Sequence, residues 1–115
     1  MIKLKRAYEA PEKKDGVRLL VERLWPRGLT KEKAAIDEWF KDVAPSPELR
    51  KWYGHDPAKW AEFRRRYLAE LKGNPGEVER LRARVGKGPV TFVYAAKDEN
   101  RNSAVLLKEH MEKTS

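Results

Sequence analysis

The sequence predicts a single α/β domain over residues 1–115, with a small, mostly parallel sheet of three or four strands and helices packed on its faces. Apolar runs at residues 17–21 and 90–96 have the length and composition of buried strands. Between them, apolar residues recur at helical spacing in segments that begin at a proline and end at a glycine. A chain of 115 residues is long enough for one modest core.

Three strands are expected from the pattern of apolar residues. In residues 2–8, Ile2, Leu4, Arg6 and Tyr8 alternate with Lys3, Lys5 and Ala7. This period of two predicts a first strand with one buried face. A polar connection ends on Asp15-Gly16, which is a turn signal. The two apolar runs that follow predict strands at 17–24 and 90–96.

The helices are expected where cap residues precede periodic apolar positions. Thr30 is expected to cap a helix with inward positions at Ala35, Ile36, Trp39, Phe40 and Val43. Three more helices are expected to open on Ser46-Pro47, Asp56-Pro57 and Asn74-Pro75 and to end at Gly54, Gly73 and Gly86. A last helix, with Ala104, Leu107 and Met111 inward, follows a polar loop at 97–103.

Composition limits the classes of protein to which this chain can belong. The formal net charge is +8, and residues 47–87 hold 11 basic and 6 acidic residues, a net charge of +5. Such a segment favours an anionic partner, although a basic surface also serves solubility alone. The chain has no cysteine, which excludes disulfides, thiolate metal sites and cysteine nucleophiles. Without a membrane-length apolar stretch or a signal-peptide pattern, we expect a cytoplasmic protein, and the high charge also suits a thermophile.

A binding site is expected where the two central strands end, because ligands collect at the carboxyl ends of parallel strands. The first loop contains the unusual quartet Trp-Pro-Arg-Gly, and the second leads into the last helix. We expect a small ligand with a phosphate or carboxylate group to bind between loops 23–28 and 97–103, through Arg23, Trp25, Arg27, Gly28, Lys97 and Asn102. Two alternatives remain open: the arginines pair with Glu22, Asp37 or Asp98 as internal struts, and Trp25 packs in the core.

Two weaker candidates favour an enzyme. His55 stands beside Asp56, and Asp98 lies in the loop after the last strand, so either could act as a general acid or base in a hydrolase without cysteine chemistry. Asp56, however, already has a role as a helix N-cap. Neither a Gly-x-Ser-x-Gly nor a phosphate-binding glycine motif occurs.

The basic helices at 57–85 provide an alternative function, the binding of nucleic acid. They contain Arg64-Arg65-Arg66 and three further arginines at 80, 82 and 84. Glutamates at 62, 70, 77 and 79 intersperse this charge, which favours a solvated surface. No metal site or cofactor is expected, because the only histidines, His55 and His110, lack ligand spacing.

Four stretches resemble the YeaO-like bacterial proteins of the DUF488 group, whose function is undefined. They are residues 21–29 (Val-Glu-Arg-Leu-Trp-Pro-Arg-Gly-Leu), 44–46 (Ala-Pro-Ser), 49–57 (Leu-Arg-Lys-Trp-Tyr-Gly-His-Asp-Pro) and 94–98 (Tyr-Ala-Ala-Lys-Asp). The resemblance covers nearly the whole chain, and its motifs are long and unusual.

The wider group implies a chemistry that this chain lacks. Longer members have cysteine and Cys-His-Arg elements after the last strand, similar to rhodanese or phosphatase loops, whereas residues 96–103 contain no cysteine. Close relatives have histidines where this chain has Arg101 and Ser103, and Glu22 stands where aspartate is usual. The missing cysteine therefore excludes a thiol mechanism, and the missing histidines argue against histidine chemistry in this loop. An anion-binding loop is compatible with both departures from the family pattern.

Overall fold

Four parallel strands form one sheet in the computed structural model, which describes residues 2–113. Their order across the sheet is β1 (Ile2–Arg6), β4 (Val90–Tyr94), β2 (Val17–Leu20) and β3 (Glu38–Trp39). Phe92 of β4 is level with Leu4 of β1 and Leu19 of β2. The predicted α/β class is confirmed, and the four strands lie within the predicted three or four; β3 is the strand that the apolar pattern did not indicate.

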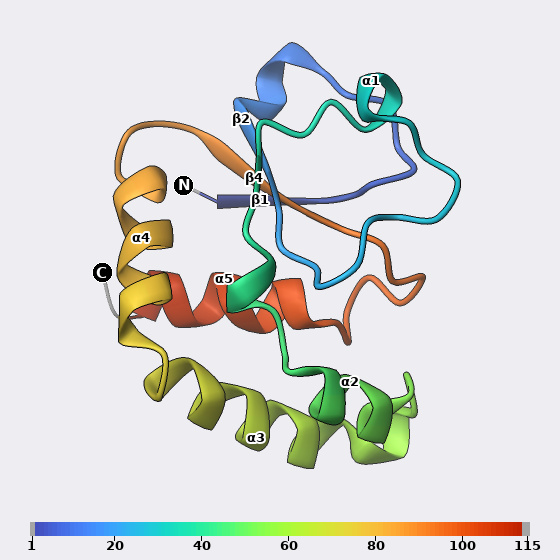
Figure 1. Ribbon diagram of the computed structural model, residues 1–115, viewed down its shortest axis with the longest axis vertical. Helices are drawn as coiled ribbons and strands as arrows, with labels where there is room; N and C mark the ends of the chain where they lie inside the picture. Colours follow the sequence, from blue (N-terminus) through green and yellow to red (C-terminus); the bar gives the residue numbers. More distant parts are fainter. Residues whose placement is uncertain (1, 114–115) are drawn as a thin grey trace.

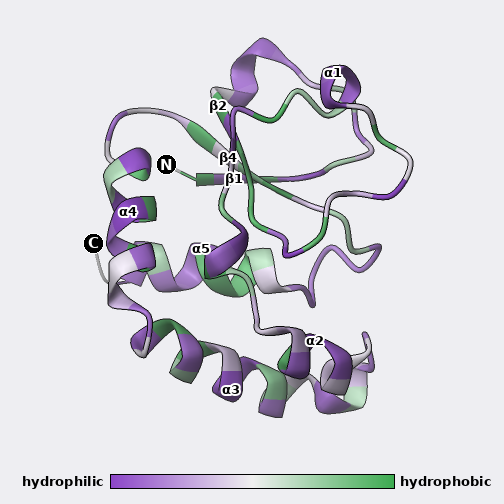
Figure 2. Cartoon of the chain, in the orientation of Figure 1, coloured by the Kyte–Doolittle hydropathy of each residue, from purple (hydrophilic) through white to green (hydrophobic). Residues whose placement is uncertain are grey.

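The longer helices lie on one side of this sheet: α2 (Pro47–Tyr53), α3 (Trp60–Lys72), α4 (Pro75–Val85) and α5 (Ser103–Lys113). The short helix α1 (Lys31–Ala34) belongs to the connection that covers the opposite face. The 3-10 turns are η1 (Lys13–Asp15), η2 (Lys41–Val43) and η3 (Pro57–Lys59). Helix α5 lies between the sheet and α3, and α2 packs beside α3 (Figure 1). Hydrophilic and hydrophobic residues alternate along α3 and α4, as expected for helices with one buried side (Figure 2). None of the described helices is both long and apolar enough to cross a membrane.

The helix boundaries follow the cap signals in the sequence. The Ser46 hydroxyl accepts a hydrogen bond of 3.2 Å from the Leu49 N–H, and the Asp56 carboxylate accepts one of 3.0 Å from the Ala58 N–H. Gly54 ends α2 in the left-handed conformation, with φ of 53°. Asn74 precedes α4 as predicted, but its side chain donates to the Asp42 carbonyl instead of capping the helix.

The helix predicted to follow Thr30 and to continue to residue 43 is wrong. Thr30 does cap a helix, but α1 ends after Ala34 because Ala35 adopts a left-handed conformation with φ of 50°. The chain then runs beside β2, where the Asp37 N–H donates to the Arg18 carbonyl and the Phe40 N–H to the Leu20 carbonyl, both at 2.8 Å. Tertiary pairing with β2 therefore overrides the local helical spacing.

The predicted strands are also shorter in the structure. The strand expected at 17–24 is regular only to Leu20, and that expected at 90–96 ends at Tyr94. The turn before β2 does require its glycine: Gly16 has φ of 66°, and a Cβ there would lie 2.3 Å from the Pro89 carbonyl oxygen.

The two faces of the sheet are buried differently. The helical face forms the main core, which contains Leu19, Phe92, Tyr67 and Leu107. The opposite face has a small apolar cluster of Ala7, Leu20 and Val93, covered by Trp25, Leu29 and Ile36 from the connection between β2 and β3. Loops rather than long helices therefore cover this second face, with η1 and α1 lying above it in Figure 1.

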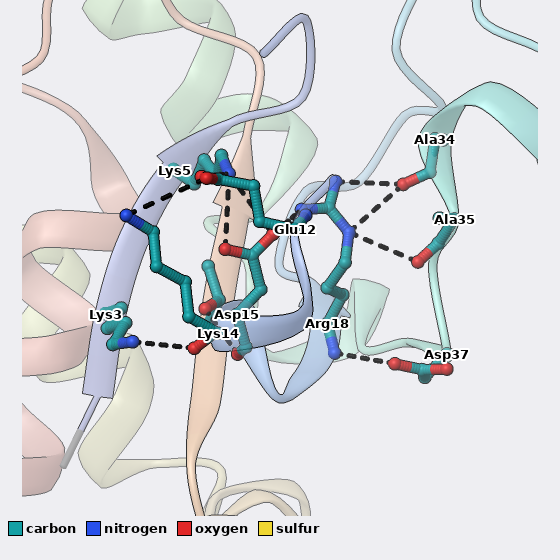
Figure 3. Close-up of polar contacts among 10 residues, drawn as sticks. Lys3, Lys5, Glu12, Lys14, Asp15, Arg18, Ala34, Ala35 and Asp37 are labelled. Carbon is teal, nitrogen blue, oxygen red and sulfur yellow. Dashed lines mark hydrogen bonds and ion pairs between the residues drawn. The ribbon is translucent and has the colours of Figure 1, made fainter. Parts of the chain in front are cut away.

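A buried ion pair fastens the covering loops to the second face (Figure 3). Arg18 Nη1 lies 2.6 Å from the Asp15 carboxylate, and each side chain is only 4% exposed. The same guanidinium donates to the carbonyl oxygens of Ala34 and Ala35 at the end of α1. Lys5 of β1 also donates to Asp15, so one network joins two strands, η1 and α1.

Candidate functional site

A pocket of about 300 Å³ lies at the carboxyl ends of β2 and β4. Because every strand is parallel, the loops after β2 and β4 emerge on the same side of the sheet, where α2 also ends (Figure 1). The described residues that line the pocket come from these segments: Tyr8, Glu22, Arg23, Leu24, Trp25, Pro26, Arg27, Ala44, Pro45, Arg50, Tyr53, His55, Phe63, Ala95, Ala96, Asn102 and Ser103.

The structure brings together most, but not all, of the residues predicted for the site. Arg23, Trp25, Arg27 and Asn102 all line the pocket, as does the catalytic candidate His55. Three others, Gly28, Lys97 and Asp98, are outside the lining. Gly28 adopts φ of 82° within the loop, and Lys97 is exposed to solvent.

Arg23 is held by the protein itself. Its Nε donates to the Pro45 carbonyl oxygen at 3.1 Å, and its Nη2 donates to the Ala44 carbonyl oxygen at 3.3 Å. Asp42 lies 3.4 Å from Nη1. Arg23 therefore acts as an internal strut, which was the alternative to ligand binding. Its partners are Pro45, Ala44 and Asp42 and not the expected acids Glu22, Asp37 or Asp98. Its positive charge still borders the pocket.

Arg27 and Arg50 differ from the other arginines of residues 2–113. Within that range, neither guanidinium has a hydrogen bond or an ion pair, whereas every other arginine side chain has at least one. Both arginines line the same pocket and both are exposed to solvent. The pocket is therefore bordered by two cationic groups whose donors are available to a ligand.

Glu22 is the one acidic residue among the described residues that line the pocket. Its Oε2 accepts a hydrogen bond of 3.1 Å from the Ala95 N–H, which joins the chain after β2 to the chain after β4. Burial raises the pKa of Glu22 above its ordinary value, although the Ala95 N–H and the nearby charges of His55 and Arg50 act in the opposite direction.

Aromatic side chains form the apolar walls. Tyr53 stacks on Phe63 with ring centroids 4.2 Å apart, and its hydroxyl donates to the Arg101 carbonyl. Trp25 lines the pocket and also packs on the small apolar cluster of the second face. Packing in the core and lining the site were predicted as alternatives, and one ring does both. The Trp25 indole N–H donates to the Leu29 carbonyl at 2.7 Å, which holds the loop in a closed turn.

Asp98 and Asn102 give the second loop its shape. The Asp98 carboxylate accepts from the backbone N–H groups of Asn100 and Arg101, and these bonds lower the pKa of Asp98. The Asn102 side chain donates to the Asp98 carbonyl and accepts from the Val105 N–H, so it caps α5. Both side chains therefore have structural partners, and Asn102 contributes mainly the start of α5 to the pocket.

His55 projects from the turn after α2. It is exposed, its backbone is left-handed with φ of 57°, and its ring centroid lies 6.0 Å from that of Tyr53. Glu22, Arg50 and Tyr53 were not among the residues predicted to bind a ligand. All three lie in the stretches that resemble the YeaO-like proteins, at residues 21–29 and 49–57, and that resemblance was the available signal.

The basic helices show a different arrangement. Each arginine of α3 and α4 forms an ion pair: Arg64 with Glu109, Arg65 and Arg66 with Glu62, Arg80 with Glu77 and Glu38, Arg82 with Glu79, and Arg84 with Glu38. These acids offset much of the positive charge that the sequence places at 57–85. Within residues 2–113, no group of three or more histidine, aspartate or glutamate side chains could hold a metal ion.

Comparison with known proteins identifies relatives over nearly the whole chain. Residues 1–115 match the family model described as "Inactive DUF488-N3 subclade". The chain is 44% identical over 108 residues to "Uncharacterized protein YeaO" of Escherichia coli, and the match covers 94% of each chain. It is 41% identical over 108 residues to "Uncharacterized protein Rv3073c" of Mycobacterium tuberculosis, covering 94% of this chain and 91% of that relative. No solved structure matches the chain.

Proposed function

The chain belongs to the DUF488 family as a YeaO-like member, and we propose that it binds a small anionic ligand in the pocket bordered by Arg27 and Arg50 without changing that ligand chemically. One observation carries the proposal. Of all the arginines in residues 2–113, the two without an internal partner lie at the same pocket. Unpaired guanidinium groups suit phosphate or carboxylate, which they can bind with two parallel hydrogen bonds.

The size and walls of the pocket support a metabolite rather than a macromolecule. Its volume of about 300 Å³ is at the lower end of the range for small-molecule sites. Trp25, Tyr53 and Phe63 supply apolar contact area, while Arg23 is fixed by carbonyl oxygens and adds positive charge at the wall. The ion pairs on α3 and α4 leave the alternative, nucleic-acid binding, with less unpaired charge to use.

Binding without catalysis is favoured over a hydrolase. The matched subclade is described as inactive. Of the two catalytic candidates, Asp98 uses its carboxylate to close its own loop. His55 has no hydrogen bond within residues 2–113 that would orient its ring as a general base.

The test measures the melting temperature and calorimetric affinity with inorganic phosphate, ethyl phosphate and succinate. Ligand binding to the folded state raises the melting temperature in a concentration-dependent way. Arg27→Ala and Arg50→Ala are each expected to weaken binding about tenfold, the loss expected for one charged hydrogen-bonding partner. Lys51→Ala, an exposed change next to Arg50 and outside the pocket lining, is the matched control and should retain affinity.

Two results would contradict the proposal. One is the absence of any stabilisation by these anions at millimolar concentration. The other is binding that Arg27→Ala and Arg50→Ala leave as strong as in the Lys51→Ala control, because the anion would then bind elsewhere on the basic surface.

A further inference from the structure

The pocket contains an acid as well as cations, which a site for a plain anion does not need. Glu22 Oε2 is occupied by the Ala95 N–H, but within residues 2–113 no donor bonds to Oε1. Among the described side chains, Arg84 Nε is the only fully buried polar atom without a hydrogen-bond partner. Glu22 Oε1, which also has no such partner, is therefore not fully buried. The Glu22 carboxylate thus has one oxygen fixed by the backbone and one available to the pocket.

No cation of the described chain neutralises this carboxylate by direct contact. Arg50 and His55 influence Glu22 through their charge, yet neither forms an ion pair with it in the described residues. A partly desolvated carboxylate without a paired cation costs folding free energy. The raised pKa of Glu22, caused mainly by burial, reflects the same cost. A bound group that donates N–H bonds to Oε1 would offset it.

Charges of both signs therefore border one cavity. Arg27 and Arg50 offer donors to an anion, while Glu22 offers an acceptor and a negative charge. Glu22 repels a ligand that is only anionic, but it attracts the positive end of a ligand that carries both charges. We propose that the natural ligand is a small zwitterion with a phosphate or carboxylate at one end and a protonated amine at the other, and that the amine binds Glu22.

This inference rests on the proposed function, so the probes are chosen to separate the two. O-phosphoethanolamine and ethyl phosphate share a phosphate on a two-carbon chain and differ by the ammonium group. We expect calorimetry to show that O-phosphoethanolamine binds about tenfold more tightly, as one hydrogen bond between charged groups provides. Glu22→Gln should reduce this ratio to about one, because it removes both the attraction for the ammonium group and the repulsion of ethyl phosphate. Glu48→Gln, an exposed change outside the pocket lining, should retain the ratio.

Equal affinity of the wild-type protein for the two probes would overturn the inference and leave the anion site standing. A preference for O-phosphoethanolamine that survives in Glu22→Gln would overturn it as well, because the amine would then bind another group. Binding of neither probe, together with no binding of inorganic phosphate or succinate, would remove the proposed function itself. The wild-type comparison needs no variant, so equal affinities for the two probes would overturn the inference even where Glu22→Gln alters folding.

Discussion

The Nε of Arg23 donates a hydrogen bond of 3.1 Å to the carbonyl oxygen of Pro45. This contact joins the loop after β2 to the connection between η2 and α2, and the Ala44 carbonyl accepts a second hydrogen bond from the same guanidinium. Arg23 and Arg27 are four residues apart in one loop, yet of their two guanidinium groups only that of Arg23 is hydrogen-bonded to the protein within residues 2–113. Substitution of Arg23 should therefore lower the free energy of unfolding more than substitution of Arg27.

Arg23→Ala is expected to lower the free energy of unfolding by about 1.5 kcal/mol, since it removes charge-assisted hydrogen bonds and leaves two carbonyl groups without a donor. Arg23→Lys should restore little of this loss, because an ammonium group cannot reproduce the fork of donors. Urea unfolding monitored by tryptophan fluorescence measures both. Arg27→Ala is the control and should leave stability unchanged; equal losses at the two positions would contradict the strut role of Arg23.

Asp15→Asn should lower the free energy of unfolding more than Arg23→Ala does, because the Arg18 guanidinium stays buried after its partner acid loses its charge. Breaking one side of a buried pair costs roughly 3 kcal/mol, which thermal or urea unfolding would detect easily. Burial alone would raise the pKa of Asp15, but hydrogen bonds from the Glu12 N–H, Lys5 and Arg18 outweigh it and lower that pKa. The pair should thus stabilise the fold above the ordinary pKa of aspartate and lose this effect as the pH falls through the lowered value.

The matched control for Asp15→Asn is Glu12→Gln, at an acid that also pairs with Lys5 but is exposed. Surface ion pairs contribute little, so this variant should unfold close to the wild type. Equal stability of Asp15→Asn and Glu12→Gln would show that the buried Asp15–Arg18 pair does not hold η1 and α1 on the second face of the sheet.

Glu22→Gln is expected to stabilise the protein at neutral pH. The pKa of Glu22 is raised in the folded state above the ordinary 4.5, so its contribution to stability is fully present below 4.5 and is lost as the pH rises through the folded value. The variant should therefore melt at a higher temperature than the wild type at about pH 7, and the difference should vanish at about pH 4.

The difference in melting temperature between the two proteins is the quantity to follow, because acids with lowered pKa values such as Asp15 and Asp98 affect both proteins alike. Glu48→Gln should show no such pH-dependent gain. A wild type more stable than Glu22→Gln at neutral pH would mean that Glu22 has a neutralising partner. A functional site that reduces stability in this way is common among binding proteins.

The helix boundaries could be predicted because their causes are local. Ser46-Pro47 and Asp56-Pro57 place a hydroxyl or carboxylate one residue before a proline, and each side chain caps backbone donors within three residues. The segment after Thr30 had an equally good cap, but its apolar residues serve two different cores. Ile36 covers the second face of the sheet, whereas Phe40 and Val43 enter the main core. Spacing alone could not distinguish that path from a helix.

The sequence by itself determined the α/β class, most helix boundaries and the two loops that meet at the pocket, because parallel strands bring their carboxyl ends to one edge. Only the tertiary structure decided which side chains in those loops are free. Arg23 and Arg27 have the same chemistry, and the difference arises because Pro45, twenty-two residues away in sequence, presents its carbonyl to one of them. Arg50 and Glu22 enter the site for the same reason: hydrogen bonds and packing between distant segments set the positions of charges that local sequence cannot specify.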